Sequence, residues 1–369
     1  MDDKQADELR SRLRAGSQKI VKPVKLQDVA DLAGVSPKTV SRVVNREPKV
    51  SPATRAKVLK IIEELNFQPN KSAQNLASDR SRLIGLIYDN PSPAYITGLQ
   101  EGVLRVCDRS GYGLIIHPSD RQDVDLVSKL RTLVTSTRLD GILLTPPFTE
   151  NQAVLDLLHE SQTPYVLISP LDPDPSELSV WSDDFSAAKQ AMQHLLDLGH
   201  QRIGFVRGLR NRSGSEMRFL GYQDSLEENG IPLDPELIVE GQFTFENAEE
   251  GARKLFLLDD RPTAIFASSD YMAAGVMKAA INMNISVPED LSLCGFDDSP
   301  IARYLTPTLT TMRHPVRKMA ASAAEKLIGT LTKSNEGQDT PPIYSELIVR
   351  ESTAPAIKKE KKFTVTAVT

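Results

Sequence analysis

Residues 36–45, SPKTVSRVVN, place short hydrogen-bonding side chains and two long cations on one side of an expected helix. At helical spacing the three valines face inward, and the side chains that face outward are Lys38, Thr39, Ser41, Arg42 and Asn45. Such groups can donate and accept hydrogen bonds at base edges and can neutralise phosphates. An ordinary solvated helix face has a similar composition, and for an arbitrary small helical unit that alternative is the commoner one.

Three short helices are expected to position this segment. Apolar residues at helical spacing predict a first helix, and the residues of its buried stripe are Leu26, Val29, Ala30 and Ala33. Gly34 ends that helix, because glycine readily adopts a left-handed backbone. Ser36 offers the oxygen of an N-cap to the second helix, and Pro37 suits its first position. Ser51 and Pro52 repeat the pair before a third helix, so a helix-turn-helix unit is predicted over residues 23–68.

The charge distribution favours a nucleic-acid partner for this unit. The first 82 residues hold 17 Lys and Arg against 10 Asp and Glu, a net charge of +7. The remaining residues hold 27 against 39, so the overall charge of −5 combines a basic head with an acidic body. This asymmetry counts against the plain solvated face.

The head resembles that of the lactose-repressor (LacI/GalR) family of transcription factors. The matching motifs are Asp28-Val29-Ala30, Ala33-Gly34-Val35-Ser36, the run TVSRVVN at residues 39–45, and Pro69-Asn70. The resemblance is ungapped there and continues along the chain except for roughly the first twenty and last fifteen residues. It implies a homodimer on a palindromic operator, with one half-site per subunit. It implies DNA contacts from Lys25, Ser36, Pro37, Lys38, Thr39, Ser41, Arg42, Asn45, Asn70, Ala73 and Leu76.

Two positions depart from the family pattern in a way that affects DNA reading. At Pro37 many relatives carry a large polar or aromatic residue, and proline has no side-chain donor. Base reading therefore falls on the other polar residues of the second helix. Lys25 stands where a threonine cap is common, and we expect it to contact phosphate.

Residues 69–81 are polar with little apolar face, and so short a helix is marginal in water. A plain linker is one interpretation. The resemblance implies instead a hinge helix that folds on DNA, pairs with its twin in the dimer and inserts Leu76 into the minor groove. A leucine wedge unstacks a base step at a cost of about a few kcal/mol and bends the duplex.

Beyond residue 82, short apolar runs alternate with amphipathic helices. The predicted strands are Leu83–Tyr88, 114–116, Gly141–Leu144, Tyr165–Ile168, 203–206, Ala264–Ala267 and 291–296. This alternation predicts parallel sheets covered on both faces, and about 270 residues is too many for one compact sheet. We therefore expect residues 82–353 to form two α/β subdomains with a cleft between them. Residues 1–22 are expected to be a flexible arm and residues 354–369 a solvated tail.

The resemblance implies that this body has the fold of periplasmic sugar-binding proteins, in which the chain crosses three times between subdomains. The crossings are expected near residues 179–183, 296–298 and 313–315. The predicted fold class is thus an all-α helix-turn-helix head plus hinge helix, joined to a periplasmic-binding-protein-like body of two parallel-sheet subdomains.

Ligands of open α/β sheets bind beyond the carboxyl ends of the strands, so the polar residues that follow each strand are candidates. Arg218 is expected to open the helix after strand 203–206, and the resemblance places it and Asp297 at ligand-contact positions. Asp270 is expected to cap its helix, and Ser169 stands where some relatives carry a sugar-binding carboxylate. Trp181, Phe243 and Phe245 are either rings that stack on a sugar or ordinary core. The complete candidate set is Tyr88, Asp89, Ser169, Trp181, Arg218, Phe243, Phe245, Ser269 and Asp297.

The sequence lacks the signatures of the main competing class, an α/β enzyme. It has no phosphate-binding glycine motif after a strand, no nucleophile elbow and no metal-ligand spacing, so no cofactor or metal is expected. Cys107 and Cys294 suit buried thiols in a reducing cytoplasm, and neither a signal peptide nor a membrane span is expected.

The sequence favours a repressor of carbohydrate-utilisation genes that is released from DNA by a mono- or disaccharide. The alternatives are a corepressor-dependent regulator or an activator that responds to a nucleobase or a phosphorylated metabolite.

Overall fold

The computed structural model describes residues 24–44, 48–67, 80–174, 176–334 and 343–356. The chain divides into two compact units, residues 1–81 and 82–369, which we call the head and the body.

The head contains the three predicted helices, α2 (Leu26–Ala33), α3 (Pro37–Val44) and α4 (Pro52–Glu64). Gly34 ends α2 in the left-handed region, with φ of 64°. Ser36 Oγ accepts a hydrogen bond from the Thr39 N–H at 3.2 Å, and Ser51 Oγ accepts one from Thr54. The predicted caps are therefore confirmed. The buried core of the head is Val29, Ala30, Ala33, Val40, Val43, Val58, Ile61 and Phe67.

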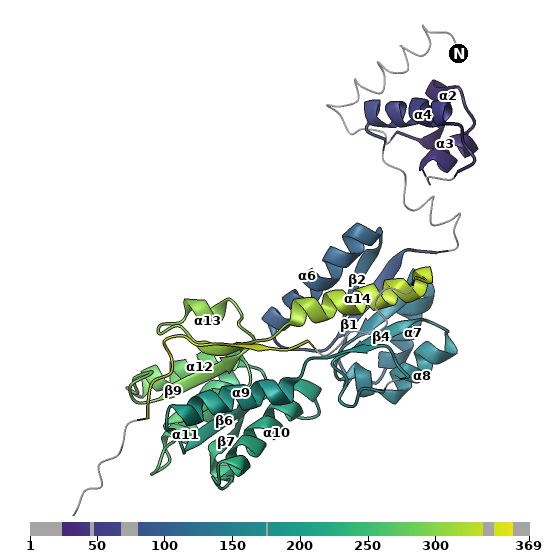
Figure 1. Cartoon of the computed structure of the whole chain (residues 1–369). Coiled ribbons are helices and arrows are strands. Elements are labelled where there is room, and N and C mark those ends of the chain that lie inside the picture. The colour runs from purple at the N-terminus through teal and green to yellow at the C-terminus, as the bar shows by residue number, and fades with distance from the viewer. Residues whose placement is uncertain (1–23, 45–47, 68–79, 175, 335–342, 357–369) are drawn as a thin grey trace, which may run out of the picture. The chain divides into compact units, whose positions relative to one another are not determined.

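The first sheet of the body is parallel, with the strand order β2-β1-β3-β4-β5. Its strands are β1 (Leu83–Tyr88), β2 (Gly113–Pro118), β3 (Gly141–Leu144), β4 (Tyr165–Ile168) and β5 (Ser179–Val180). One face packs against α6 (Pro93–Ser110) and α14 (Val316–Thr332), and the other packs against α7 (Leu126–Thr137) and α8 (Gln152–Glu160). We call this half of the body the first subdomain (Figure 1).

The second sheet has the order β11-β10-β9-β8-β6-β7 and is parallel except for β11. Its strands are β6 (Ile203–Arg207), β7 (Ile238–Glu240), β8 (Ala264–Ala267), β9 (Ser292–Phe296), β10 (Thr310–Arg313) and β11 (Glu346–Ile348). One face packs against α9 (Asp184–Asp197) and α10 (Ser213–Glu228), and the other packs against α11 (Phe245–Phe256) and α12 (Asp270–Asn282). This half is the second subdomain.

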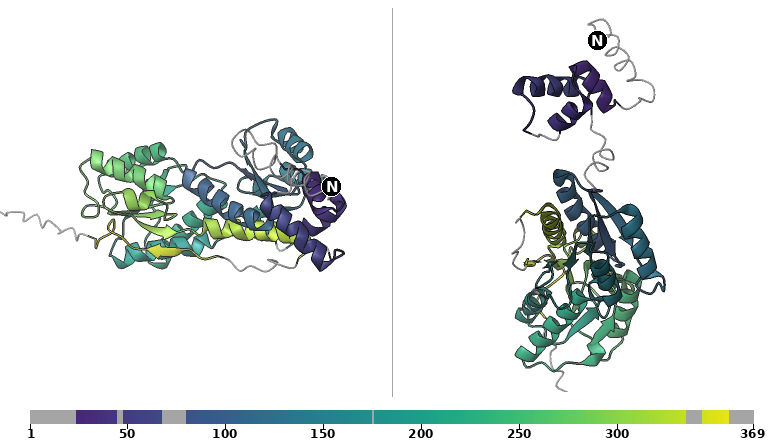
Figure 2. Two further views of the ribbon diagram at one scale, coloured as in Figure 1. Left: turned by 90° about the horizontal axis from the view of Figure 1, so that it is seen from above. Right: turned by 90° about the vertical axis from the view of Figure 1, so that its right-hand side faces the viewer.

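The last long helix, α14, belongs by packing to the first subdomain although it follows the second in sequence. It lies alongside α6, as both Figure 1 and the left view of Figure 2 show. Each subdomain is therefore covered by helices on both faces of its sheet, as the alternating pattern predicts.

The chain crosses between the subdomains at β5 to α9 and again at β10 to α14, as expected. The crossing expected near residues 296–298 is wrong. From β9 the chain continues through the short helix α13 (Ile301–Tyr304) to β10, which pairs with β9 in the same sheet. The remaining crossing joins α14 to β11, and Ile343 pairs there with Ser182 of the first crossing.

Residues 354–356, which were expected to belong to the solvated tail, are instead bonded to the second subdomain. The Ala354 carbonyl accepts hydrogen bonds from His200 and Ser292, and the Ala356 N–H donates to Leu198. His200 is buried and also bonds Thr263, so its predicted structural role is confirmed.

Cys107 and Cys294 are free and buried, as expected. Among the described residues, no helix is long and apolar enough to span a membrane.

Candidate functional site

The exposed face of α3 matches the helical pattern of the sequence. Val40 and Val43 are buried, Lys38 is exposed, and Thr39, Ser41 and Arg42 are partly exposed. The buried valines thus set which face of the helix is turned inward, and the polar side chains lie at the surface.

The start of α3 is more ordered than its composition suggests. The hydroxyls of Ser36 and Thr39 lie 2.9 Å apart and bond each other, and each keeps hydrogen-bonding capacity for a further partner. Lys25 is exposed at the start of α2, where its backbone N–H donates to the Asp28 carboxylate at 2.7 Å. Pro37 is the first residue of α3 and is partly exposed. The other predicted DNA contacts, Asn45, Asn70, Ala73 and Leu76, lie outside the described residues.

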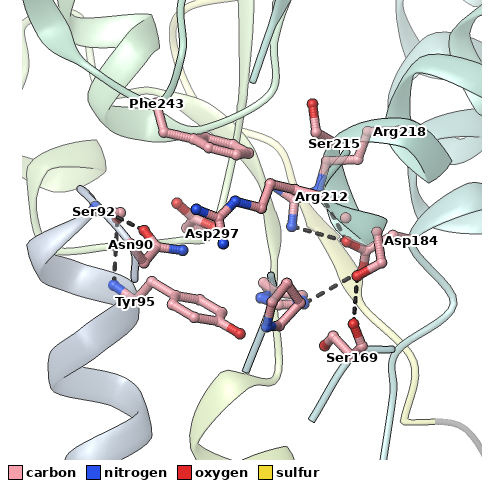
Figure 3. Close-up of a pocket in the computed structure, with 14 residues that line it drawn as sticks. Asn90, Ser92, Tyr95, Ser169, Asp184, Arg212, Ser215, Arg218, Phe243 and Asp297 are labelled. Atoms are coloured by element: carbon pink, nitrogen blue, oxygen red, sulfur yellow. Dashed lines mark hydrogen bonds and ion pairs between the residues drawn. The ribbon is translucent and has the colours of Figure 1, made fainter. Parts of the chain in front are cut away.

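In the body, a pocket lies between the two subdomains at the carboxyl ends of their strands (Figure 3). The cavity has a volume of about 60 Å³ and is open to solvent. Its polar lining includes Asn90, Ser169, Asp184, Arg212, Arg218 and Asp297, and Phe243 supplies a ring. Both subdomains therefore contribute side chains to one site.

Three residues of the lining have a backbone conformation that side chains rarely adopt. The φ angles of Ser169, Phe243 and Asp297 are 55°, 59° and 126°. Such conformations cost of the order of 1–3 kcal/mol each and gather at ligand sites. The Phe243 ring also requires a glycine beside it, since a Cβ on Gly208 would lie 2.2 Å from a ring carbon. Local strain thus aims these side chains at the pocket.

The sequence suggested that Arg218 opens the helix after β6. That prediction is wrong, because α10 begins at Ser213 and Arg218 lies within it. Its Nε and Nη2 donate to the Asp184 carboxylate at 3.1 and 2.9 Å, and its Nη1 donates to the Ser268 carbonyl at 2.7 Å. The guanidinium carbon lies 3.6 Å from the centre of the Phe296 ring. Arg218 therefore lines the pocket as one half of a buried, well-bonded ion pair.

Asp184 is the centre of a network at the crossings. Burial alone would raise the pKa of Asp184, but Arg218 and His314 lower it below its ordinary value. Ser182 Oγ donates to Asp184 at 2.6 Å and lies 2.8 Å from His314 Nε2. Because Ser182 and His314 belong to the two crossings where the described chain is continuous, this network joins the pocket to the segments that connect the subdomains.

Arg212 precedes α10 and reaches across the cleft. Its Nη2 donates to Asp89 of the first subdomain at 3.2 Å. Its Nε and Nη1 are buried without a hydrogen-bond partner in the part of the chain that the structure describes. Burial lowers the pKa of the Arg212 guanidinium. The second subdomain thus presents uncommitted donors on a buried side chain.

Asp297 is the uncommitted acceptor of the same pocket. Within the described ranges, no group donates a hydrogen bond to its carboxylate, which Figure 3 shows among the side chains that line the pocket. Burial raises the pKa of Asp297 well above its ordinary value, against the opposing effect of Arg218. A ligand hydroxyl would provide a partner for this carboxyl group.

Of the predicted pocket residues, Ser169, Arg218, Phe243 and Asp297 come together in the lining, and Asp89 lies behind them as the partner of Arg212. The others are not in the lining. Tyr88 packs against the core of the first subdomain, Phe245 packs against Tyr271, and Trp181 is partly buried at the first crossing.

Neither Ser269 nor Asp270 has its expected role, and neither lines the pocket. Ser269 caps α12 by accepting a hydrogen bond from the Met272 N–H, so its side chain is not a pocket contact. Asp270 is the first residue of the helix and accepts from the Ser299 N–H, the Ser299 hydroxyl and the Thr311 hydroxyl. It therefore ties α12 to the loop after β9.

Sequence reasoning missed Tyr95, Asp184, Arg212, Ser215 and His314 as lining residues. Arg212 was within reach, because it lies in the loop that directly follows β6 at the carboxyl edge of the sheet. Asp184 and His314 had no such signal, since only the crossings bring them to the pocket. Among the described residues, no cluster of potential metal ligands occurs.

The head matches the family model described as "Bacterial regulatory proteins, lacI family" over residues 25–70, and residues 192–353 match a periplasmic-binding-protein-like domain. Catabolite control protein A of Priestia megaterium is 34% identical over 89% of this chain and 99% of its own length. The chain belongs to the lacI family of bacterial regulatory proteins. It is therefore a DNA-binding transcriptional regulator with an effector-binding body, and not an enzyme.

Further similar proteins match the chain over nearly its whole length, and two solved structures match its fold. The probable repressor ExuR of Bacillus subtilis (strain 168) is 31% identical over 89% of this chain and 98% of its own length. A lac repressor dimer bound to operator and the anti-inducer ONPF has a TM-score of 0.76 at 26% identity, over 90% of this chain and 100% of that one. A CelR–cellobiose complex has a TM-score of 0.66 at 29% identity, over 89% and 99%. The predicted family and the predicted folds of the head and the body are confirmed, whereas residues 69–79 of the predicted hinge helix lie outside the described residues.

Proposed function

We propose that the chain represses carbohydrate-utilisation genes as a homodimer on a palindromic operator, and that a small sugar bound in the pocket releases it. The observation that carries the proposal is the position of the pocket between the two subdomains. Both subdomains line it, and the Asp184 network connects it to two crossings of the chain.

A ligand in such a pocket can bias the relative arrangement of the subdomains. It does so only to the extent that it binds one arrangement better than the other, and typical couplings are ~1–3 kcal/mol. Contacts with Arg212 on one side and Asn90 or Ser169 on the other depend on how far the cleft is closed. The effector therefore has a physical means of changing the body.

The lining suits a hydroxylated ligand. Asp297 offers an unpaired carboxyl group, and the Phe243 ring supplies an apolar surface beside it (Figure 3). Alternating donors and acceptors around one apolar ring are what hydroxyl-rich rings require. The cellobiose bound to one structural neighbour supports a sugar for this chain too.

On the DNA side, we assign base reading to Lys38, Thr39, Ser41 and Arg42 and phosphate contact to Lys25. Their exposure on α2 and α3 and the basic charge of the head support this assignment. The hinge residue Leu76 is proposed as the minor-groove wedge.

The decisive experiment is a DNA-binding titration on promoters of the chain's own and neighbouring genes, repeated with a panel of mono- and disaccharides. Release by one sugar is the expected result. Tighter binding in the presence of a ligand would replace release with corepression. Failure to bind any of these promoters would contradict the proposed function as a whole.

A further inference from the structure

We propose that the effector is an acidic sugar, whose carboxylate or phosphate binds Arg212 and the N-terminus of α10 while its hydroxyls face Asp297. The inference rests on the proposed function of the pocket as the effector site.

The Arg212 side chain is the main observation. The residue is only 5% exposed, yet its Nε and Nη1 have no hydrogen-bond partner in the part of the chain that the structure describes. A buried guanidinium with unpaired donors is costly, because a buried polar group without a partner loses its hydration without compensation. An anionic oxygen in the pocket would complete these bonds, and charge-assisted bonds are roughly twice as strong as neutral ones.

The first turn of α10 adds donors to the same place. Within the described residues, the backbone N–H groups of Ser213, Gly214 and Ser215 have no acceptor, and all three residues line the pocket. The Ser215 hydroxyl is fully buried and also lacks a partner. Unpaired N–H groups and the positive end of a helix dipole together favour an anion.

The charge pattern distinguishes the two arginines. Arg218 is fully matched, since two of its nitrogens bond the buried carboxylate of Asp184. Arg212 has one bond to Asp89, whose side chain is 28% exposed and therefore partly screened by solvent. The anionic group of a ligand would thus meet the positive charge that the pocket leaves least compensated.

A neutral sugar would leave this end of the pocket unsatisfied. Hydroxyl oxygens can accept hydrogen bonds, but they bring no charge to a desolvated guanidinium. Discrimination against a ligand that leaves buried polar groups unpaired can reach ~10⁴-fold in built sites. We therefore expect an acid to bind at least tenfold more tightly than its neutral counterpart.

The test uses the full chain and matched probes that differ in one group. D-glucose is compared with D-glucuronate and glucose 6-phosphate, D-galactose with D-galacturonate, and D-ribose with ribose 5-phosphate, by calorimetry and by the shift in Tm. Inorganic phosphate, against chloride at equal ionic strength, probes the anion position alone. An acid or phosphate ester should bind at least tenfold more tightly than its neutral partner, and phosphate should raise the Tm. The carboxylate and phosphate arms identify the source of the anion.

Arg212→Gln should remove the preference for the acid and the stabilisation by phosphate, whereas Arg212→Lys should keep part of both. Arg210→Gln is the matched control, because Arg210 precedes it by two residues, is 67% exposed in its side chain and pairs with Glu240 outside the pocket. The Tm of each variant without ligand shows whether it folds.

Three results would overturn the inference. One is a neutral sugar that binds as tightly as its acid. Another is an undiminished acid preference in Arg212→Gln. The third is that every anion tested, inorganic phosphate included, raises the Tm of the wild-type chain no more than it raises the Tm of Arg212→Gln. A neutral sugar that releases the operator would overturn the acidic effector and leave the proposed function intact. If the chain binds the acid but binds no operator, the acidic ligand stands and the proposed function is overturned.

Discussion

Two arginines six positions apart, both buried in one pocket, show how partners decide what a side chain does. Arg218 has its carboxylate and a carbonyl as partners, so it holds the pocket together. Arg212 has donors to spare and points into the cavity, so it is available to a ligand. At the scale of single residues the family resemblance is correct in placing Arg218 in the lining, but the hydrogen bonds give it a structural role as well.

Arg218→Ala should therefore cost stability as well as the effector response. Removing one partner leaves the buried Asp184 carboxylate uncompensated, and breaking a buried pair costs ~3–5 kcal/mol. Urea unfolding followed by circular dichroism measures the loss. Arg253→Ala, in an exposed helical pair with Glu249, should cost less than ~0.5 kcal/mol. Equal losses in the two variants would contradict this account of the buried pair.

Lys38 and Lys25 should affect DNA binding differently. Lys38→Gln should change the preferred base at one or more operator positions, with ~1–3 kcal/mol of altered discrimination. Lys25→Gln should weaken binding to all sequences alike and reduce the salt slope by about 1. Selection from a random DNA library and salt titrations separate the two. An unchanged base preference in Lys38→Gln would remove this residue from base reading.

At the scale of elements, the close packing of α6 against α14 joins segments more than 200 residues apart in sequence. Gly98 and Gly102 on α6 make the approach possible. A Cβ on Gly102 would lie 2.4 Å from the Arg317 carbonyl oxygen and 2.7 Å from the Ala320 Cβ. The helix that completes the first subdomain therefore depends on these missing side chains.

Gly102→Ala should destabilise the body by ~1–3 kcal/mol, because backbone and not a flexible side chain blocks the added methyl group. The higher helix propensity of alanine, worth ~1 kcal/mol, opposes this cost and sets its lower end. Arg105→Ala, exposed on the same helix, should change stability by less than ~0.5 kcal/mol. Thermal unfolding gives both numbers, and a stabilised Gly102→Ala would show that the helices can separate without cost.

His200 gives the second subdomain a predictable pH dependence. It bonds Thr263, Ser292 and Ala354, and burial lowers the pKa of His200 below its ordinary value near ~6.5. The unfolded chain binds its proton first as the pH falls, so stability is present above that value and decreases below it, by at most ~1.4 kcal/mol per pH unit.

His200→Gln should reduce the loss of stability between pH 7 and pH 5, measured as urea midpoints at both pH values. His159→Gln is the control, because that histidine bonds Tyr165 in an exposed pair. If both variants keep the full wild-type pH dependence, the proton is taken up elsewhere, and His194, whose pKa burial also lowers, becomes the next residue to test.

At the scale of the whole molecule, function requires that the pocket of the body influence DNA binding by the head. The proposed connection runs from the pocket through the Asp184 network to the crossings, and from the first subdomain to the hinge. The size of the coupling equals the difference in effector affinity between the two states of the body.

Leu76→Ala tests the DNA end of this connection. Loss of the wedge should reduce operator affinity by well over tenfold, more than ~1.4 kcal/mol, and leave effector binding intact. Leu220→Ala makes the same chemical change at an exposed position of the body and should leave operator affinity unchanged. Fluorescence anisotropy with labelled operator measures both. A loss of less than threefold would assign Leu76 to a plain linker.

Much of this protein was predictable from local patterns. The caps at Ser36 and Ser51, the glycine turn at Gly34 and most strands are short-range features, since each depends on residues a few positions apart. The basic head, the family and the two-subdomain body were predictable for the same reason. Strands β5, β7 and β11 were not, because they have only two or three residues each, and β10 was not, because its sequence TTMR contains no apolar run.

The sequence by itself therefore determined that the chain is a regulator with a reading helix and a cleft at the carboxyl ends of two sheets. The tertiary structure alone decided which side chains meet in that cleft. Asp184, Arg212 and His314 come from three distant segments, and their meeting depends on where the chain crosses between subdomains. The spacing of apolar residues along a sequence predicts helices and strands, because these depend on residues a few positions apart. Hydrogen-bond partners across a cleft depend instead on how distant segments pack together.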